Sequence, residues 1–524
     1  MKRITCDALI IGAGPSGSTY ARVLVSEGLK TIMVDTGPQY SKRPGENLKN
    51  SFPFQRNMGN FASMIRGFLH LISVPTSGGS SAFLDPITYK PDSGFIKNAM
   101  NPRQDPNKNL DGAAAAYSVG GMLLHWTGAV PRHHPELERI KFISNDEWED
   151  LYTEAEKILN KHTDVYEKSI RNSVLKDVLS SYYPHLKYPY HVQNLPMGAE
   201  RSSINSELVR FTGTDTILSP IIDNPEINDG RFEIRPQHRV KRLHVENGAV
   251  VYAEVDDLQN GERINIYASR FIVACGTIMS AQLLWASGIR PEALGRYLYD
   301  HPIAFCQVIL SKELIEKMSS ELRSSENKLS FAANDPLPIP INDPAPNIWI
   351  PVSEGRPWHC QITKDAFHYG DLPANVDDRV IVDLRWFARI ETRPENRVIF
   401  EEDIFNEFGM PQPTFEYGFS EADAKLMHEM MIDMTNAAQS LGGFLPGSEP
   451  KFMPWGLCLH AQGTCRMGEK DDGKSVVDPY SKVWNIDNLY IGGNSIIPTS
   501  NACNPTLTNV ALAVRGARNI VNNK

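Results

Sequence analysis

Cysteine is scarce in this 524-residue chain, and the seven thiols between Cys6 and Cys503 are odd in number. Secreted domains that rely on disulfides usually carry a denser, even set of cysteines, so the sequence favours reduced thiols and a cytoplasmic protein. No run of 18 or more apolar residues occurs, so the sequence offers no candidate membrane-spanning helix. The brief basic start leads into an apolar run and a glycine motif rather than a small-residue cleavage site. We therefore expect a strand there and no signal peptide.

The chain also lacks an excess of positive charge and any internal repeat. Its net charge is −9, so no electrostatic argument favours nucleic acid or an anionic membrane as a partner. The apolar fraction of 41% is ordinary for a globular protein. The length exceeds what one hydrophobic core usually serves. We therefore expect two domains and a small, uncharged binding partner.

A glycine motif follows the first apolar run of the sequence. The run CDALII, residues 6–11, has the character of a buried strand, and the GxGxxG spacing of Gly12, Gly14 and Gly17 follows at once. In a dinucleotide site the first glycine allows the tight turn, the second lets the backbone approach the pyrophosphate, and the third lets the helix pack on the strand. A second strand ends at Asp35, where a ribose-binding carboxylate belongs. A flavin and a nicotinamide both use this unit, so the motif alone leaves the cofactor open.

Hydrophobic patterns divide the chain into two interleaved sets of segments. Strand patterns, the first of them at 231–240, precede a strand, a Cys-Gly turn and a helix at 270–289, which return the chain to the nucleotide-binding sheet. The block 303–455 shows alternating stretches and a capped helix from Ser420 to Leu441, which indicate a mixed or antiparallel sheet. We predict an α/β protein with one Rossmann-like domain and one substrate domain. The first comprises 1–135, 230–302 and 456–524, and the second comprises 136–229 and 303–455.

The stretch GLCLHAQGTCRMG, residues 456–468, places Cys458, His460 and Cys465 close together. A zinc site needs four ligands, usually in paired spacings, and this stretch supplies three, so we expect no metal. If 457–460 is extended, Cys458 and His460 share one face and line the same pocket. Cys465 is interpreted as a buried structural thiol.

Several long motifs carry a family resemblance. The VACG turn at 273–276, YLYDHP at 297–302, the H-x4-CRMG element, GGNSIIPT at 492–499 and NPTLT at 504–508 resemble the glucose-methanol-choline (GMC) oxidoreductases. The segments LHWTG at 124–128, PWHCQITKDAFHYG at 357–370, 385–415 with its MPQPTF, and GGFLPGS at 442–448 resemble the pyranose oxidase branch of that family. The likeness extends over nearly the whole chain.

The resemblance implies an FAD that accepts hydride from C2 or C3 of a pyranose sugar or glycoside and yields the keto sugar. The hydride goes to flavin N5, and the electrons then pass to O2, giving H2O2, or to a quinone or other acceptor. The family's catalytic histidine falls on His460 and its asparagine partner on Asn504. An alcohol does not ionise at neutral pH, so a neutral imidazole suits the general base and an uncharged amide suits the positioning of the hydroxyl.

The resemblance also assigns binding residues. The flavin attachment site, where the family has one, falls on His125, and Thr127 lies near the reactive nitrogen of the flavin. The implied cofactor-binding set comprises Gly12, Gly14, Gly17, Asp35, Gly120, Gly121, His125, Trp126, Thr127, Val240, Gly493, Asn494, Pro505 and Thr506. The implied substrate set comprises Gln361, Asp365, Phe367, His368, Tyr369 and Cys458. The remaining histidines, including His301, are interpreted as surface or core residues.

Departures from the family pattern leave alternatives open. Leu124 precedes His125 where flavin-attached relatives have Thr, so covalent attachment is undecided. The segments that form the extra domain and tetramer arm of long fungal pyranose oxidases are shortened or missing here, which favours a monomer or dimer. Sequence does not separate an oxidase from an acceptor-dependent dehydrogenase. A catalytically silent flavin-binding protein is disfavoured because His460 and Asn504 are both present. A nicotinamide dehydrogenase is disfavoured because one dinucleotide motif is evident.

Overall fold

The structure is a computed structural model, and it describes residues 2–51, 69–72, 101–204, 208–227, 229–324, 335–341, 343–363 and 376–523. Four of the expected substrate residues, Asp365, Phe367, His368 and Tyr369, lie outside the described residues. Among the described residues, no helix is both long enough and apolar enough to cross a bilayer.

The first sheet has seven strands and contains the N-terminal end of the described chain. Six strands follow the order β10-β11-β12-β1-β2-β9, and β21 pairs with β12. Their bounds are β1 (Lys2–Ile11), β2 (Thr31–Val34), β9 (Phe232–Arg235), β10 (His238–Glu246), β11 (Ala249–Asp257), β12 (Arg263–Val273) and β21 (Leu489–Ile491). Parallel pairing joins β1 to β2 and β12, β2 to β9, and β12 to β21. This parallel region has the Rossmann-like character that the glycine motif predicts.

Helices cover the parallel strands of this sheet. The helix α1 (Pro15–Ser26) follows β1 directly, because Gly12 has a φ of 105° and turns the chain where a Cβ would meet the Ala274 carbonyl at 2.3 Å. The last helix, α11 (Thr506–Asn522), packs on α1 and on α5 (Asn145–Ile158). Ala8 and Ile10 belong to one hydrophobic cluster and Leu9 and Ile11 to another, so both faces of β1 are covered and Ala8–Ile11 is buried continuously instead of alternately.

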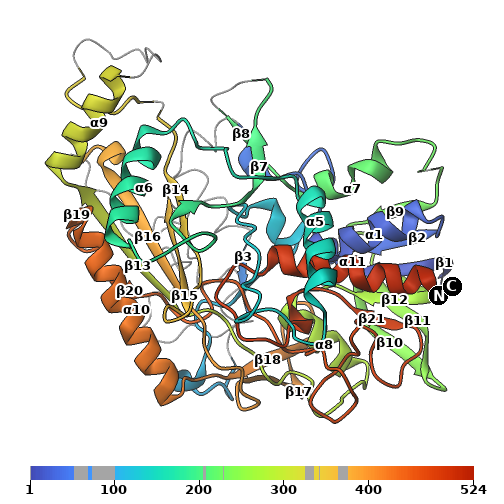
Figure 1. The fold of residues 1–524 in the computed structure, drawn as a ribbon. Coiled ribbons are helices and arrows are strands. Elements are labelled where there is room, and N and C mark those ends of the chain that lie inside the picture. Colours follow the sequence, from blue (N-terminus) through green and yellow to red (C-terminus); the bar gives the residue numbers. More distant parts are fainter. Residues whose placement is uncertain are drawn as a thin grey trace.

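The second sheet also has seven strands, and every pairing in it is antiparallel. The strand order is β19-β13-β16-β15-β14-β6, with β20 paired to β13. The bounds are β6 (Gln193–Asn194), β13 (Ile303–Leu310), β14 (Asn347–Ile350), β15 (Trp358–Thr363), β16 (Ile381–Ala388), β19 (Gly442–Phe444) and β20 (Lys451–Phe452). Figure 1 shows this sheet at the opposite end of the molecule from β1 and α11.

Helices also flank the second sheet. The helix α10 (Glu421–Gln439) packs on β16 and begins with a capping box between Ser420 and Asp423, as the sequence pattern indicates. The helix α6 (Ile170–Tyr182) contacts β14 and α9 (Lys312–Ser324). One hydrophobic cluster contains Leu9 of the first sheet and Trp386 of the second, so the two layers share a core.

The remaining elements lie between or beside the two sheets. They are β3 (Leu69–Leu71), β4 (Ala114–Ala116), β5 (Lys161–His162), β7 (Met197–Arg201), β8 (Val209–Phe211), β17 (Arg397–Phe405), β18 (Pro411–Glu416), α7 (Thr214–Ile222) and α8 (Thr277–Ala286). The single strand expected at 231–240 is wrong. Gln237 has a φ of 56°, and the segment forms β9 and β10 at opposite ends of the strand order. The α/β class and the two sheets are confirmed, and the interleaved domain boundaries stay a prediction.

Candidate active site

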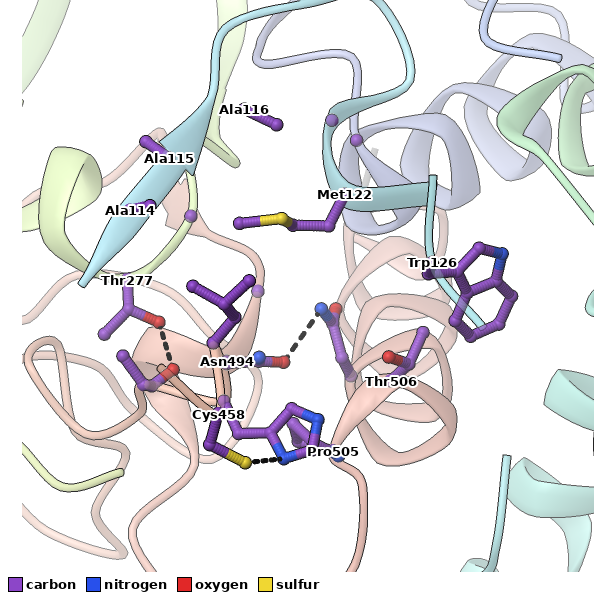
Figure 2. Close-up of a pocket in the computed structure, with 18 of the residues that line it drawn as sticks. Ala114, Ala115, Ala116, Met122, Trp126, Thr277, Cys458, Asn494, Pro505 and Thr506 are labelled. Carbon is purple, nitrogen blue, oxygen red and sulfur yellow. Dashed lines mark hydrogen bonds between the residues drawn. The ribbon is translucent and has the colours of Figure 1, made fainter. Parts of the chain in front are cut away.

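A cavity of about 280 Å³ lies between the two sheets. Its wall includes the glycine turn after β1, the strand β4, the segment 121–127, the start of α8, the segment 456–461, and the start of α11. The second sheet contributes Gln361 from β15 and Arg385 and Phe387 from β16. Figure 2 shows Cys458, Pro505 and Thr506 on the side of the cavity away from the Ala114–Ala116 strand, with Met122 between them. Segments far apart in sequence thus form one site.

The glycine turn forms an open cradle at one end of the cavity. Gly14 lines the cavity, and a Cβ placed there would meet no atom within 4 Å. Gly17 does not line it and packs against the turn, where a Cβ would lie 2.0 Å from the Gly12 carbonyl oxygen. Asp35 accepts hydrogen bonds from the backbone N–H of Ala13 and Gly37, both at 2.9 Å. Burial raises the pKa of Asp35 to about 7. This end fits the phosphate and ribose of a dinucleotide.

Three helices present their N-termini to the cavity. They are α1, α8 and α11, whose N-caps Gly14, Gly276 and Pro505 form no side-chain capping hydrogen bond. Residues at the start of each helix line the cavity wall. Uncapped N–H groups and the positive end of the helix dipole favour negative charge, so the cavity suits an anionic cofactor. Gly493 and Asn494, before α11, also line the cavity, and a Cβ on Gly493 would meet nothing within 4 Å.

The segment carrying His125 forms another wall. His125 is buried, and its Nε2 has no hydrogen-bond partner among the described residues although the ring lines the cavity. Burial lowers the pKa of His125 to about 4, so the imidazole is neutral. Trp126 donates from Nε1 to the Thr212 carbonyl oxygen at 2.7 Å, and Thr127 lines the cavity. The Nε2 atom of His125 is therefore available to hydrogen-bond a bound cofactor.

Three predicted cofactor residues take different positions. Gly121 lines the cavity, and a Cβ there would lie 3.2 Å from the Cα of Gly14. Gly120 does not line it and packs against Gly45, 2.8 Å from where its Cβ would lie. Val240 lines a second cavity of about 80 Å³, which shares Gly12, Asp35 and Cys275 with the first. The two cavities meet beside Asp35.

His460 is held by an unusual turn. The expectation of an extended 457–460 segment is wrong, because Leu457 and Cys458 lie in a turn and Leu459 has a φ of 60°. The Asp300 carboxylate accepts from the backbone N–H of His460 at 3.0 Å and so supports this conformation. Cys458 and His460 nevertheless both line the cavity, with Sγ and Nδ1 2.9 Å apart. Cys465 is buried.

The other ring nitrogen of His460 faces Asn504. Nε2 lies 3.3 Å from Asn504 Nδ2, and Asn504 Oδ1 accepts from Gln361 Nε2 at 2.7 Å. The enclosed position of His460, and then the nearby His301, hold the pKa of its imidazole well below the usual range. The ring is therefore neutral and able to take a proton. Predicted catalytic and substrate residues thus lie together at the same end of the cavity.

Asn504 owes its position to a buried carboxylate. Glu138 is fully buried, and its Oε1 accepts from the backbone N–H of Ala502 at 2.7 Å and of Cys503 at 3.1 Å. These charge-assisted bonds fix the loop that precedes α11.

The atoms around His460 Nδ1 have hydrogen-bond spacing. His301 Nδ1 lies 3.1 Å from it, and Cys458 Sγ lies 2.9 Å from it. Two ligands of a tetrahedral zinc ion would stand about 3.3 to 3.6 Å apart. Although the three side chains offer possible metal ligands, their spacing is that of hydrogen-bonded groups.

Sequence reasoning missed four residues around the site. Asp300, Arg385 and Phe387 line the cavity. The fourth residue, His301, contacts Nδ1 of His460 through its own Nδ1. His301 is buried, as expected for a core residue, but its contact with His460 was not foreseen. Asp300 and His301 belong to the YLYDHP motif, so a signal was present in the sequence. What was lacking is the pairing of that motif with His460, 159 positions away.

Comparisons with known proteins agree on one family. Two models described as GMC oxidoreductase match residues 210–303 and 393–513. Pyranose 2-oxidase of Emericella nidulans is 37% identical, over 98% of this chain and 92% of the relative. C-glycoside 3-oxidase of Arthrobacter globiformis is 33% identical, over 98% and 94%. The crystal structure of a formate oxidase has a TM-score of 0.69 at 14% identity, over 100% of this chain and 99% of that chain, which shows a shared fold.

Proposed function

The chain belongs to the GMC oxidoreductase family, and from that premise we propose that it is an FAD-dependent oxidase of pyranose sugars or glycosides. The proposed reaction converts a ring hydroxyl at C2 or C3 to the ketone. The observation that carries the proposal is that His460 Nε2 and Asn504 Nδ2 face each other at 3.3 Å in the cavity that the glycine turn also lines. The curated relatives named pyranose 2-oxidase and C-glycoside 3-oxidase support a sugar as the substrate.

The cofactor fits the residues of the cavity. The glycine turn and Asp35 would hold its phosphates and ribose, and three helix N-termini favour its negative charge. His125 Nε2, which has no partner among the described residues, would face the flavin side. When bound, FAD supplies a hydride acceptor at N5 and passes both electrons to O2, which takes two protons and becomes H2O2.

His460 would act as the base. The substrate C–O–H group loses a hydride from carbon and a proton from oxygen, and the C–O bond becomes a carbonyl. The lone pair of a neutral imidazole takes that proton, which is typically worth about 10² to 10⁴ in rate. Asn504 would hold the hydroxyl at His460, because its own carbonyl is already occupied by Gln361.

The substrate end of the cavity suits a sugar. Phe387 offers an aromatic face, and Gln361, Arg385 and Cys458 offer polar atoms around it. Sugars are bound by such combinations of an apolar surface and a few placed polar groups. The segment with Asp365, Phe367, His368 and Tyr369 stays a prediction as a further part of this site.

An anaerobic experiment tests the proposal. The purified yellow protein is mixed with glucose and with O- and C-glucosides, the flavin absorbance is followed, and the product is identified by NMR. We expect bleaching of the flavin and a 2-keto or 3-keto sugar. A flavin that no sugar bleaches would refute the proposal and favour a silent flavin-binding protein.

The electron acceptor and flavin attachment need separate measurements. Peroxide formed per sugar oxidised, compared with quinone reduced, separates an oxidase from an acceptor-dependent dehydrogenase. After acid precipitation, a yellow pellet means that the flavin is covalently attached, and a colourless pellet excludes attachment through His125. All seven cysteines are free, which supports the proposal of a reducing, cytoplasmic environment.

A further inference from the structure

We propose that His301 and Asn501, which no part of the proposed reaction uses, determine which ring nitrogen of His460 carries a proton. The pair would place that proton on Nδ1 and leave Nε2 bare toward the cavity. This inference deepens the proposed function and rests on it, because a base is useful only if its lone pair points at the substrate. His301 and Asn501 would be positioning residues, because they act on the substrate through His460.

The argument begins at Asn501, whose amide orientation is fixed by a backbone carbonyl. Asn501 is fully buried, and its Nδ2 lies 3.0 Å from the Thr499 carbonyl oxygen and 3.0 Å from Gln462 Oε1. A carbonyl oxygen accepts only, so the atom facing it must be the NH2 group. Oδ1 of Asn501 therefore points to the other side, toward His301.

The second step assigns the proton of His301. Nε2 of His301 lies 2.9 Å from Asn501 Oδ1, which has no hydrogen to give. The Gln462 amide Nε2 also lies 3.2 Å from His301 Nε2, but it donates to the same Asn501 Oδ1 at 3.2 Å. The shorter contact, from His301 Nε2 to Asn501 Oδ1, therefore assigns the hydrogen to Nε2, since two lone pairs at that distance would repel. Burial lowers the pKa of His301 to about 4, so the ring is neutral and holds a single N–H. Its Nδ1 is consequently bare.

The third step passes this assignment to His460. The bare Nδ1 of His301 lies 3.1 Å from Nδ1 of His460 and can only accept, so His460 donates from Nδ1. Because His460 is also neutral, its Nε2 is bare. The Asn504 contacts agree with this tautomer, since Gln361 donates to its Oδ1 and its NH2 group faces Nε2.

Cys458 makes the arrangement sensitive to His301. Its Sγ lies 2.9 Å from the same Nδ1 of His460, and burial keeps the thiol protonated by raising its pKa well above the usual value. A thiol can accept weakly or donate. While His301 takes the Nδ1 hydrogen, the sulfur can only accept. Without His301, the thiol would donate to Nδ1 and drive the hydrogen of His460 to Nε2, which is the unproductive tautomer.

Two variants of equal shape test the inference. His301→Asn keeps an oxygen that can accept from His460 Nδ1, whereas His301→Leu has the same branching and no acceptor. We expect His301→Leu to slow anaerobic flavin reduction by about 10- to 100-fold. This is the typical effect of leaving a buried donor, here His460 Nδ1, without a hydrogen-bond acceptor. His301→Asn should stay much closer to wild type. Flavin content and the sugar concentration for half-maximal reduction should be unchanged in both.

The double variant with Cys458→Ala separates tautomer control from damage to the fold. We expect Cys458→Ala to recover part of the rate lost in His301→Leu, because the competing donor is gone. Equal losses in His301→Leu and His301→Asn, or no recovery in the double variant, would overturn the inference.

Nitrogen-15 NMR of histidine-labelled resting protein provides a readout that needs no substrate. The His460 signal, identified by its loss in His460→Ala, should show a bare Nε2 in wild type and a protonated Nε2 in His301→Leu. A protonated Nε2 in wild type would refute the inference. If that NMR result holds but no sugar bleaches the flavin, the tautomer control stands and the proposed function fails.

Discussion

At the scale of single residues, the smallest unit of the proposed reaction is the pair of His460 and Asn504. His460→Ala and Asn504→Ala should each lower the rate of flavin reduction by about 10² to 10⁴, because the first removes the proton acceptor and the second removes the group that positions the hydroxyl. Flavin should stay bound, since the glycine turn lies at the other end of the cavity. Stopped-flow reduction measures the rate, and His185→Ala, at an exposed histidine, is the control. Full activity in either site variant would contradict the proposed mechanism.

Asp300 leads to a prediction about pH. Burial raises its pKa to about 7 in the folded protein, against about 3.9 in an unfolded chain. Below about pH 4 this carboxyl group is protonated in both states and does not change the free energy of unfolding. As pH rises through 7, the buried charge comes to lower the free energy of unfolding by about 4 kcal/mol. Asp300→Asn, which keeps an acceptor for the His301 and His460 N–H groups, should remove this dependence.

Thermal unfolding between pH 5 and 8 measures the effect of Asp300 on stability. The wild type should lose more stability than Asp300→Asn over this range, because contributions from other carboxyl groups cancel between the two proteins. Parallel curves would show that Asp300 does not titrate in this way.

At the scale of elements, we expect the turn between β1 and α1 to determine cofactor binding. Gly12→Ala would place a Cβ 2.3 Å from the Ala274 carbonyl at a φ of 105°, so β1 and the end of β12 must move apart. Gly14→Ala meets no atom within 4 Å and only fills space that faces the cavity.

We therefore expect Gly12→Ala to lower both melting temperature and flavin content, and Gly14→Ala to lower flavin content alone. Absorbance ratios and thermal unfolding of flavin-free protein measure the two effects. A yellow, stable Gly12→Ala protein would contradict this account.

Local patterns in the sequence predict single helices and strands better than they predict the contacts between these elements. The β1-α1-β2 unit and the capping box of α10 follow from glycine spacing and from Ser420 with Asp423. The division at Gln237 and the turn at Leu459 depend on positive φ at residues that are not glycine, which composition does not reveal. The pairing of His301 with His460 is set by tertiary packing, so the YLYDHP motif was visible while its partner was not.

At the scale of the whole molecule, the chain spans 92% of the Emericella nidulans relative and should be a monomer or dimer. The resemblance implies that the segments which form a tetramer arm are shortened or missing here, so we expect no larger assembly. Light scattering after size-exclusion chromatography should give a mass near 58.6 kDa or twice that value. A mass near four times 58.6 kDa would show that other surfaces assemble the tetramer.

The position of the two chain ends has a consequence for how the protein is made. Figure 1 shows the N- and C-terminal ends side by side, where α11 packs on α1 and β21 completes the sheet that β1 begins. Gly14 and Pro505 line the same cavity, so the proposed cofactor site is complete only after the chain through α11 has been synthesised. We therefore expect a nascent chain that stops before α11 to bind no flavin.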